Sequence, residues 1–168
     1  MTPKLRIGLG AFLVSLCLDL VSKYLVNAHL HYGDKKELIE GFFYLTHVRN
    51  PGAAFGLFAT APQDVRLVFF ISISVVAIGI IISFFRKLAP GDRLSALALG
   101  FILGGALGNL IDRIRYGEVV DFLHFRLWQG YSWPDFNLAD SFIVVGVALL
   151  LLELFATEGE RSTPPPAS

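Results

Sequence analysis

Two aspartates, Asp121 and Asp140, are the residues of this sequence best suited to hydrolytic chemistry. Cleavage of an amide without a metal or a nucleophile needs one group that takes a proton from water and another that gives one to the scissile bond. Two carboxylates about 4 Å apart, at an effective dielectric near 20, repel each other by roughly 4 kcal/mol, or about 3 pKa units. Such a pair would keep one proton near neutral pH and could serve both purposes.

Each aspartate also has a purely structural explanation. Asp121 could be an ordinary loop carboxylate. Asp140 could cap the N-terminus of a helix, and Asn137, three residues earlier, is a competing cap. The pattern of these residues alone leaves both explanations open.

A second set of polar residues interrupts segments that are otherwise apolar. Asp19 and Lys23 are four residues apart, so they share one helix face, where they could neutralise each other and support a site. Asp112 and Arg113 could be a helix-end charge pair that reaches water. Alternatively, the guanidinium could hold a substrate or orient its polar neighbours.

Other hydrolytic designs find little support. The sequence has no His-Glu-x-x-His pattern, and its histidines at 29, 31, 47 and 124 are scattered, which argues against a zinc protease. It has no Gly-x-Ser-x-Gly elbow, and Ser132 has only His124 as a conceivable base. Cys17 lies in an apolar segment, where a thiol is inert. We therefore expect no metal and no cofactor.

The elements that must position these residues are membrane-spanning helices. The chain is 54% hydrophobic and 17% charged, with long charge-free runs at 67–85 and 94–111. The predicted spans cover about 7–28, 65–86, 94–114 and 138–157, and the outer segments cover 29–64 and 115–137. Residues 158–168, rich in proline, are expected to form a disordered tail. The net charge of zero gives no reason to expect a nucleic-acid partner.

The basic residues predict the orientation of these spans. Lys4 and Arg6 precede the first span, and Arg86, Lys87 and Arg93 lie between the second and the third. Both segments should face the cytoplasm. A cleaved signal peptide fits the first segment poorly, because its apolar pattern continues past Cys17. With four uncleaved spans, the unusual polar residues gather at the outer membrane boundary.

The outer segments have the character of a small sheet. Residues 41–49 are aromatic and β-branched and end in the turn Asn50-Pro51-Gly52, and residues 119–125 also favour an extended strand. In the third span, Gly100, Gly104 and Gly108 recur every four residues, which is typical of close helix packing in membranes.

Taken in order, these blocks resemble the lipoprotein signal peptidases (signal peptidase II). The resemblance runs from Asp19 to Asp140 and has one small departure, Leu20, where many members carry Gln. The blocks are Asp19-x-x-x-Lys23, Asn50-Pro-Gly-Ala-Ala-Phe-Gly56, Gly104-Gly-Ala-Leu-Gly108-Asn109-Leu-Ile-Asp112-Arg113, Val120-Asp121-Phe122 and Phe136-Asn137-Leu-Ala139-Asp140.

The resemblance implies a mainly α membrane protein with four transmembrane helices, a small outer-face β-sheet and a surface lid. It implies an aspartyl endopeptidase of the bacterial inner membrane that cuts diacylglyceryl-modified prolipoproteins just before the lipidated cysteine. It also implies inhibition by globomycin. A monomer is expected, although the sequence itself does not reveal the oligomeric state. Asp121 and Asp140 would be the catalytic dyad. The residues that bind substrate or support the dyad would be Asn50, Asn109, Arg113, Asn137, Asp112, Asp19 and Lys23.

Two other classes of function remain open at this point. A small transporter or channel subunit would use Asp19, Lys23 and Asp112 to line a path, and it would carry polar residues through the full depth of the membrane. A structural assembly subunit would tolerate the replacement of both dyad aspartates by asparagine.

Overall fold

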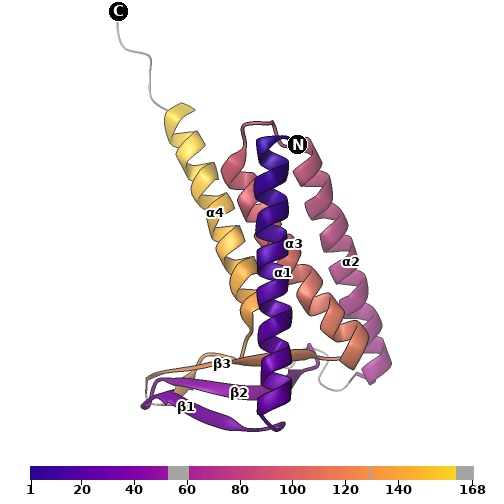
Figure 1. Ribbon diagram of the computed structural model, residues 1–168, viewed down its shortest axis with the longest axis vertical. Helices are drawn as coiled ribbons and strands as arrows, with labels where there is room; N and C mark the ends of the chain where they lie inside the picture. Colours follow the sequence, from indigo (N-terminus) through magenta and orange to yellow (C-terminus); the bar gives the residue numbers. More distant parts are fainter. Residues whose placement is uncertain (53–60, 129, 162–168) are drawn as a thin grey trace, which may run out of the picture.

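Four long helices form a bundle with a small antiparallel sheet across one end (Figure 1). The computed structural model describes residues 1–52, 61–128 and 130–161. The helices are α1 (Pro3–His29), α2 (Gln63–Lys87), α3 (Arg93–Tyr116) and α4 (Leu138–Arg161). The N-terminus of α1 and the C-terminal end of α4 lie at the end of the bundle away from the sheet.

The helices have the surface of a membrane protein. All four are long and apolar enough to cross a bilayer. Helix α2 has no buried residue, and its large apolar side chains, such as Val68, Val76 and Phe84, are exposed along its length. A surface of this kind is stable against lipid tails and costly in water. The predicted fold class is therefore confirmed.

The observed helices extend beyond the predicted spans at several ends. Helix α1 begins at Pro3 because proline is well suited to the first helical position. Helix α4 continues to Arg161, into the stretch expected to be a tail, and residues 162–168 lie outside the described part. The segment before Asn50, which was expected to form the sheet and the lid, forms β1 and β2, and its action as a lid stays a prediction. Residues 53–60 also lie outside the described part.

Helix α3 is the centre of the bundle and contacts the other three helices. Its glycines allow this close packing, as the sequence predicted. A Cβ atom added to Gly104 would lie 2.0 Å from Ser15 Oγ, and one added to Gly108 would lie 2.2 Å from Asp19 Oδ2. Both distances are far below van der Waals contact. The absence of a side chain on α3 therefore brings Asp19 of α1 directly against it.

The sheet contains β1 (Lys35–Ile39), β2 (Phe43–Asn50), β3 (Val119–Trp128) and β4 (Tyr131–Ser132), in that order and antiparallel throughout. The two predicted outer strands therefore pair with each other as β2 and β3. Asp121 lies opposite Val48, beside an irregularity in the β2 register between Leu45 and Val48. Such irregularities often redirect side chains next to functional sites.

Short connections bring the polar ends of the helices to this sheet. Helix α3 ends at Tyr116 and is capped by Gly117, which adopts a left-handed conformation (φ 76°) while its N–H donates to the Arg113 carbonyl. Strand β3 begins two residues later. Its residues Val120 and Phe122 pack with Val26 near the end of α1 that meets the sheet. The start of β3 is thereby held between α1 and α3.

Candidate active site

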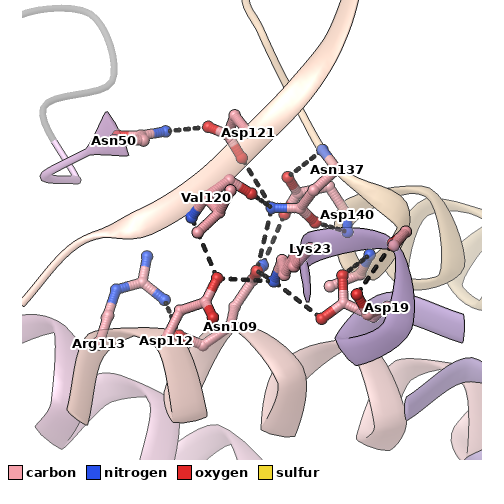
Figure 2. A network of polar contacts seen from close by, with 12 residues as sticks. Asp19, Lys23, Asn50, Asn109, Asp112, Arg113, Val120, Asp121, Asn137 and Asp140 are labelled. Carbon is pink, nitrogen blue, oxygen red and sulfur yellow. Dashed lines mark hydrogen bonds and ion pairs between the residues drawn. The ribbon is translucent and has the colours of Figure 1, made fainter. Parts of the chain in front are cut away.

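All nine side chains that the sequence singled out belong to one polar network, where the helices meet the sheet (Figure 2). They come from α1, the end of β2, α3, β3 and the start of α4. These residues are Asp19, Lys23, Asn50, Asn109, Asp112, Arg113, Asp121, Asn137 and Asp140.

Lys23 is the buried cation of this network, with an exposed fraction of 2%. Its Nζ lies 2.8 Å from Asp19 Oδ2 and 3.0 Å from Asp112 Oδ2, and it donates a 2.9 Å hydrogen bond to Asn109 Oδ1. The ammonium thus has two carboxylates and one amide oxygen within 3.0 Å. The prediction that Asp19 and Lys23 neutralise each other was therefore incomplete, because α3 supplies a second carboxylate, Asp112.

The two carboxylates bound to Lys23 also hold the backbone that carries the other aspartates. Asp19 Oδ1 accepts a 2.9 Å hydrogen bond from the Ala139 N–H, and Asp112 Oδ2 accepts one of 3.0 Å from the Val120 N–H. Ala139 and Val120 directly precede Asp140 and Asp121. The ion cluster thus determines where both candidate catalytic residues lie. Sequence reasoning missed these two amides, because backbone groups leave no signal in residue type.

Asn137 is fully buried and joins the two candidate catalytic aspartates. Its Nδ2 donates to Asp121 Oδ1 at 2.7 Å, to Asn109 Oδ1 at 3.1 Å and to the Val120 carbonyl at 3.2 Å. Its Oδ1 accepts from the Asp140 N–H at 3.0 Å, and its own N–H donates to Asp140 Oδ2 at 3.3 Å. This reciprocal arrangement resembles a capping box. Asn137 is therefore the helix cap, and the Asp140 carboxylate also interacts beyond its own helix.

Asp121 lies on β3 with an exposed fraction of 1%. Asn50 Nδ2 donates to Asp121 Oδ2 at 2.9 Å, and the Asn50 amide is itself oriented by the Gly52 N–H, which donates to Asn50 Oδ1 at 2.8 Å. Burial raises the pKa of Asp121 to about 7, and the charge of Asp140 acts in the same direction, against the bonds from Asn50 and Asn137. Asp121 can therefore hold a proton near neutral pH.

Asp140, in the first turn of α4, is less buried than Asp121. Its Oδ1 accepts a 2.8 Å hydrogen bond from Asn109 Nδ2. Asn109 thus orients the Asp140 carboxylate through its Nδ2, while the Oδ1 of Asn109 accepts hydrogen bonds from Lys23 and Asn137. The arrangement places a deeply buried carboxyl, with its pKa raised to about 7, in one network with a more accessible carboxyl. General acid–base catalysis needs two groups in different environments of this kind.

The sequence left open whether Arg113 and Asp112 form a charge pair at the end of the helix. The structure does not show this pair. Asp112 has an exposed fraction of 3% and binds Lys23 instead. The Arg113 guanidinium lies 5.3 Å from the centre of the Phe70 ring on α2, and its NH1 is 3.4 Å from the Asn109 carbonyl. It therefore lies at the edge of the network, between α2 and α3.

The distribution of polar groups also bears on the transporter hypothesis. The network lies where the bundle meets the sheet, and none of its members comes from the opposite end of a helix (Figure 2). The hypothesis expected polar residues through the full depth of the bundle. This geometry gives it no support.

Comparisons with known proteins agree with the resemblance. A family model described as "Signal peptidase (SPase) II" matches residues 11–156. The chain is 46% identical to the lipoprotein signal peptidase of Geobacter sulfurreducens over 96% of this chain and 99% of that protein. It is 44% identical to the lipoprotein signal peptidase of Moorella thermoacetica over 91% and 95% of the two chains.

Two solved structures described as bacterial membrane enzymes share the fold. One superposes with a TM-score of 0.79 at 31% identity, covering 98% of this chain and 94% of that one. The other has a TM-score of 0.76 at 34% identity, covering 90% and 91%. On the family match and these identities, the chain belongs to the signal peptidase II family and is a multi-pass membrane peptidase.

Proposed function

We propose that this protein is an aspartic endopeptidase that removes the signal peptide from diacylglyceryl-modified prolipoproteins, cutting just before the lipidated cysteine. Asp121 and Asp140 are the catalytic pair. The observation that carries the proposal is that both carboxylates bind Asn137 within one polar network. Burial, which raises the pKa of Asp121 to about 7, supports the division of roles between them. The names of the relatives, lipoprotein signal peptidases, support the choice of substrate.

In the proposed reaction, Asp140 is the general base and Asp121 the general acid. Asp140 takes a proton from a water molecule, and the oxygen of this water attacks the scissile carbonyl carbon. The Asp121 proton then reaches the amide nitrogen as the C–N bond breaks, and the proton taken by Asp140 restores the singly protonated pair. The difference in burial between the two carboxyls supports this assignment, because burial favours the neutral form.

The other network residues have two kinds of task in this proposal. Asn109 and Asn137 hold the two carboxyls in position, and the cluster of Lys23, Asp19 and Asp112 fixes the backbone beneath them. Asn50 and Arg113 lie at the edge of the network and are the groups we assign to substrate binding. A guanidinium is well suited to hold peptide carbonyl groups by paired hydrogen bonds.

The proposed orientation places both termini in the cytoplasm and the sheet at the outer face of the inner membrane. Basic residues at the end of the bundle away from the sheet support it, namely Lys4, Arg6, Arg86, Lys87 and Arg93. The candidate site then lies at the level where a lipid-anchored cysteine meets the membrane boundary. We further expect a monomer, and inhibition by globomycin as the family resemblance implies.

The decisive experiment is a gel-shift cleavage assay of the purified protein on a lipidated precursor. We expect Asp121→Asn and Asp140→Asn each to lower the cleavage rate by at least 10²-fold while leaving the protein folded, as expected for the loss of a general acid or base. Asp34→Asn, an exposed carboxylate beside β1, is the matched control and should cleave normally. Cleavage at the wild-type rate by either dyad variant would refute the assignment.

A further inference from the structure

An apolar cavity lies at the opposite end of the bundle from the candidate active site. It has a volume of about 350 Å³ and is lined by α1, α2 and α3. Its lining includes Leu5 and Leu9 of α1, Ile82 and Phe85 of α2, and Leu103 of α3. This volume falls at the lower end of the range that small-molecule sites in proteins occupy, roughly 300–1,000 Å³.

The cavity opens toward the lipid. Leu5, Leu9 and Ile82 have exposed fractions of 42%, 41% and 41%, although each also lines the cavity. Two of its lining residues are glycines, where the helices lie very close together. A Cβ on Gly8 would lie 2.3 Å from Phe85 Cε2, and a Cβ on Gly100 would lie 2.4 Å from the Gly8 carbonyl oxygen. The cavity beside these backbones is bounded mainly by apolar side chains, a suitable surface for an acyl chain.

The one charged residue among those lining the cavity is Arg86, an exposed side chain near the end of α2. Lys4 at the start of α1 is close by, since its ammonium donates to the Leu88 carbonyl just after α2. Two acidic side chains at this end, Asp92 and Glu153, are not among the residues that line the cavity. Asp92 accepts from the Ala89 N–H, and Glu153 accepts from the Ser95 hydroxyl. Arg86 therefore gives the lining of the cavity a positive charge at this end.

We propose that this cavity is a specific binding site for one anionic phospholipid. An acyl chain fills the apolar cavity, and the lipid phosphate pairs with Arg86 at its mouth. Basic pockets between transmembrane helices on the cytoplasmic side are suited to anionic headgroups. A zwitterionic lipid of the same chain length could enter the same cavity, but it would present the guanidinium with no net negative charge. In the orientation proposed above, this lipid belongs to the inner leaflet.

Native mass spectrometry of the purified full-length protein tests this site. The protein is offered equal amounts of phosphatidylglycerol and phosphatidylcholine with identical acyl chains. We expect wild type to retain phosphatidylglycerol about fivefold more than phosphatidylcholine, the preference expected from one well-placed basic residue. Arg86→Gln should abolish this preference. Arg93→Gln removes the same charge at the same end of the bundle but outside the cavity lining, so it should keep the preference.

A second variant tests the acyl-chain part of the site. Leu9→Trp should narrow the cavity from its exposed rim and lower the retention of both lipids, with no change in elution on size exclusion. Equal retention of the two lipids by wild type would overturn the proposal. So would a persisting preference in Arg86→Gln, or an equal loss in Arg93→Gln, which would indicate only a diffuse basic surface.

Discussion

Replacing Lys23 by Met gives the most direct test of how the site is held together. The side chain is buried at 2% exposure, and its ammonium is the cation bound by both Asp19 and Asp112. Methionine has a similar volume, so the expected loss comes from two carboxylates left without their counter-charge. Breaking one buried ion pair costs about 3–5 kcal/mol. Because two carboxylates share this lysine, we expect a loss at the upper end of that range.

The assay is thermal unfolding in detergent, followed by the fluorescence of Trp128 and Trp133, the only two tryptophans of the chain. In a chain of this size, about 1 kcal/mol shifts the melting temperature by about 2–4 °C. Lys23→Met should therefore melt roughly 10 °C or more below wild type. Lys36→Met, an exposed lysine on β1, is the control and should change stability by no more than about 0.5 kcal/mol.

A double variant shows whether the unpaired charge causes the loss. Adding Asp19→Asn to Lys23→Met removes one uncompensated carboxylate but keeps an oxygen for the Ala139 N–H. We expect this addition to restore about 1–3 kcal/mol, within the usual range of coupling between contacting residues. If Lys23→Met melts within about 3 °C of wild type, or if the second substitution lowers the melting temperature further, the reasoning is wrong.

Three further predictions test the packing, the protonation state and the asparagine bridge. Gly108→Ala should lower the free energy of unfolding by about 1–3 kcal/mol, because its Cβ would lie 2.2 Å from Asp19 Oδ2. The Cβ of the control, Gly10→Ala, would meet nothing within 4 Å, so thermal melting should show this variant to be neutral or slightly stabilised. Burial raises the pKa of Asp121 to about 7, so wild type should lose stability as the pH rises from about 4 to about 7. The free energy of unfolding of Asp121→Asn, relative to that of wild type, should therefore increase by about 3 kcal/mol from pH 5 to pH 8. An equal difference in melting temperature between variant and wild type at the two pH values would contradict this. Asn137→Ala should lose about 1–2 kcal/mol of helix-capping stability and lower kcat for the lipidated precursor, and an unchanged kcat would exclude Asn137 from the bridge between the aspartates.

The membrane fold could be predicted because the signals for it are local. The charge-free runs at 67–85 and 94–111 each match the thickness of a bilayer, and any helix that they form must lie in lipid. The polar residues were informative for the same reason. Asp19, Lys23 and Asp112 are costly at membrane depth unless they bind one another, so their presence in apolar segments predicted a site. Gly104 and Gly108 likewise indicated a close helix contact.

The details of the network could not be predicted, because they join residues that are far apart in the chain. The sequence paired Lys23 with Asp19, its neighbour on the same helix, but only the packing of α1 on α3 adds Asp112 and Asn109. The sequence offered both Asn137 and Asp140 as the residue that caps α4. Burial of Asn137 under β3 resolved this choice in favour of Asn137.

The sequence by itself therefore determined that this is a four-span membrane protein and which side chains must find partners inside it. Both properties follow from residue type, since apolar runs need lipid and buried charges need counter-charges. The tertiary structure alone decided which partners those are. Asp19 reaches the Ala139 amide across 120 positions of sequence, and such a contact depends on how helices pack and where backbone N–H groups point. No local sequence pattern encodes the packing of the helices or the direction of these backbone N–H groups.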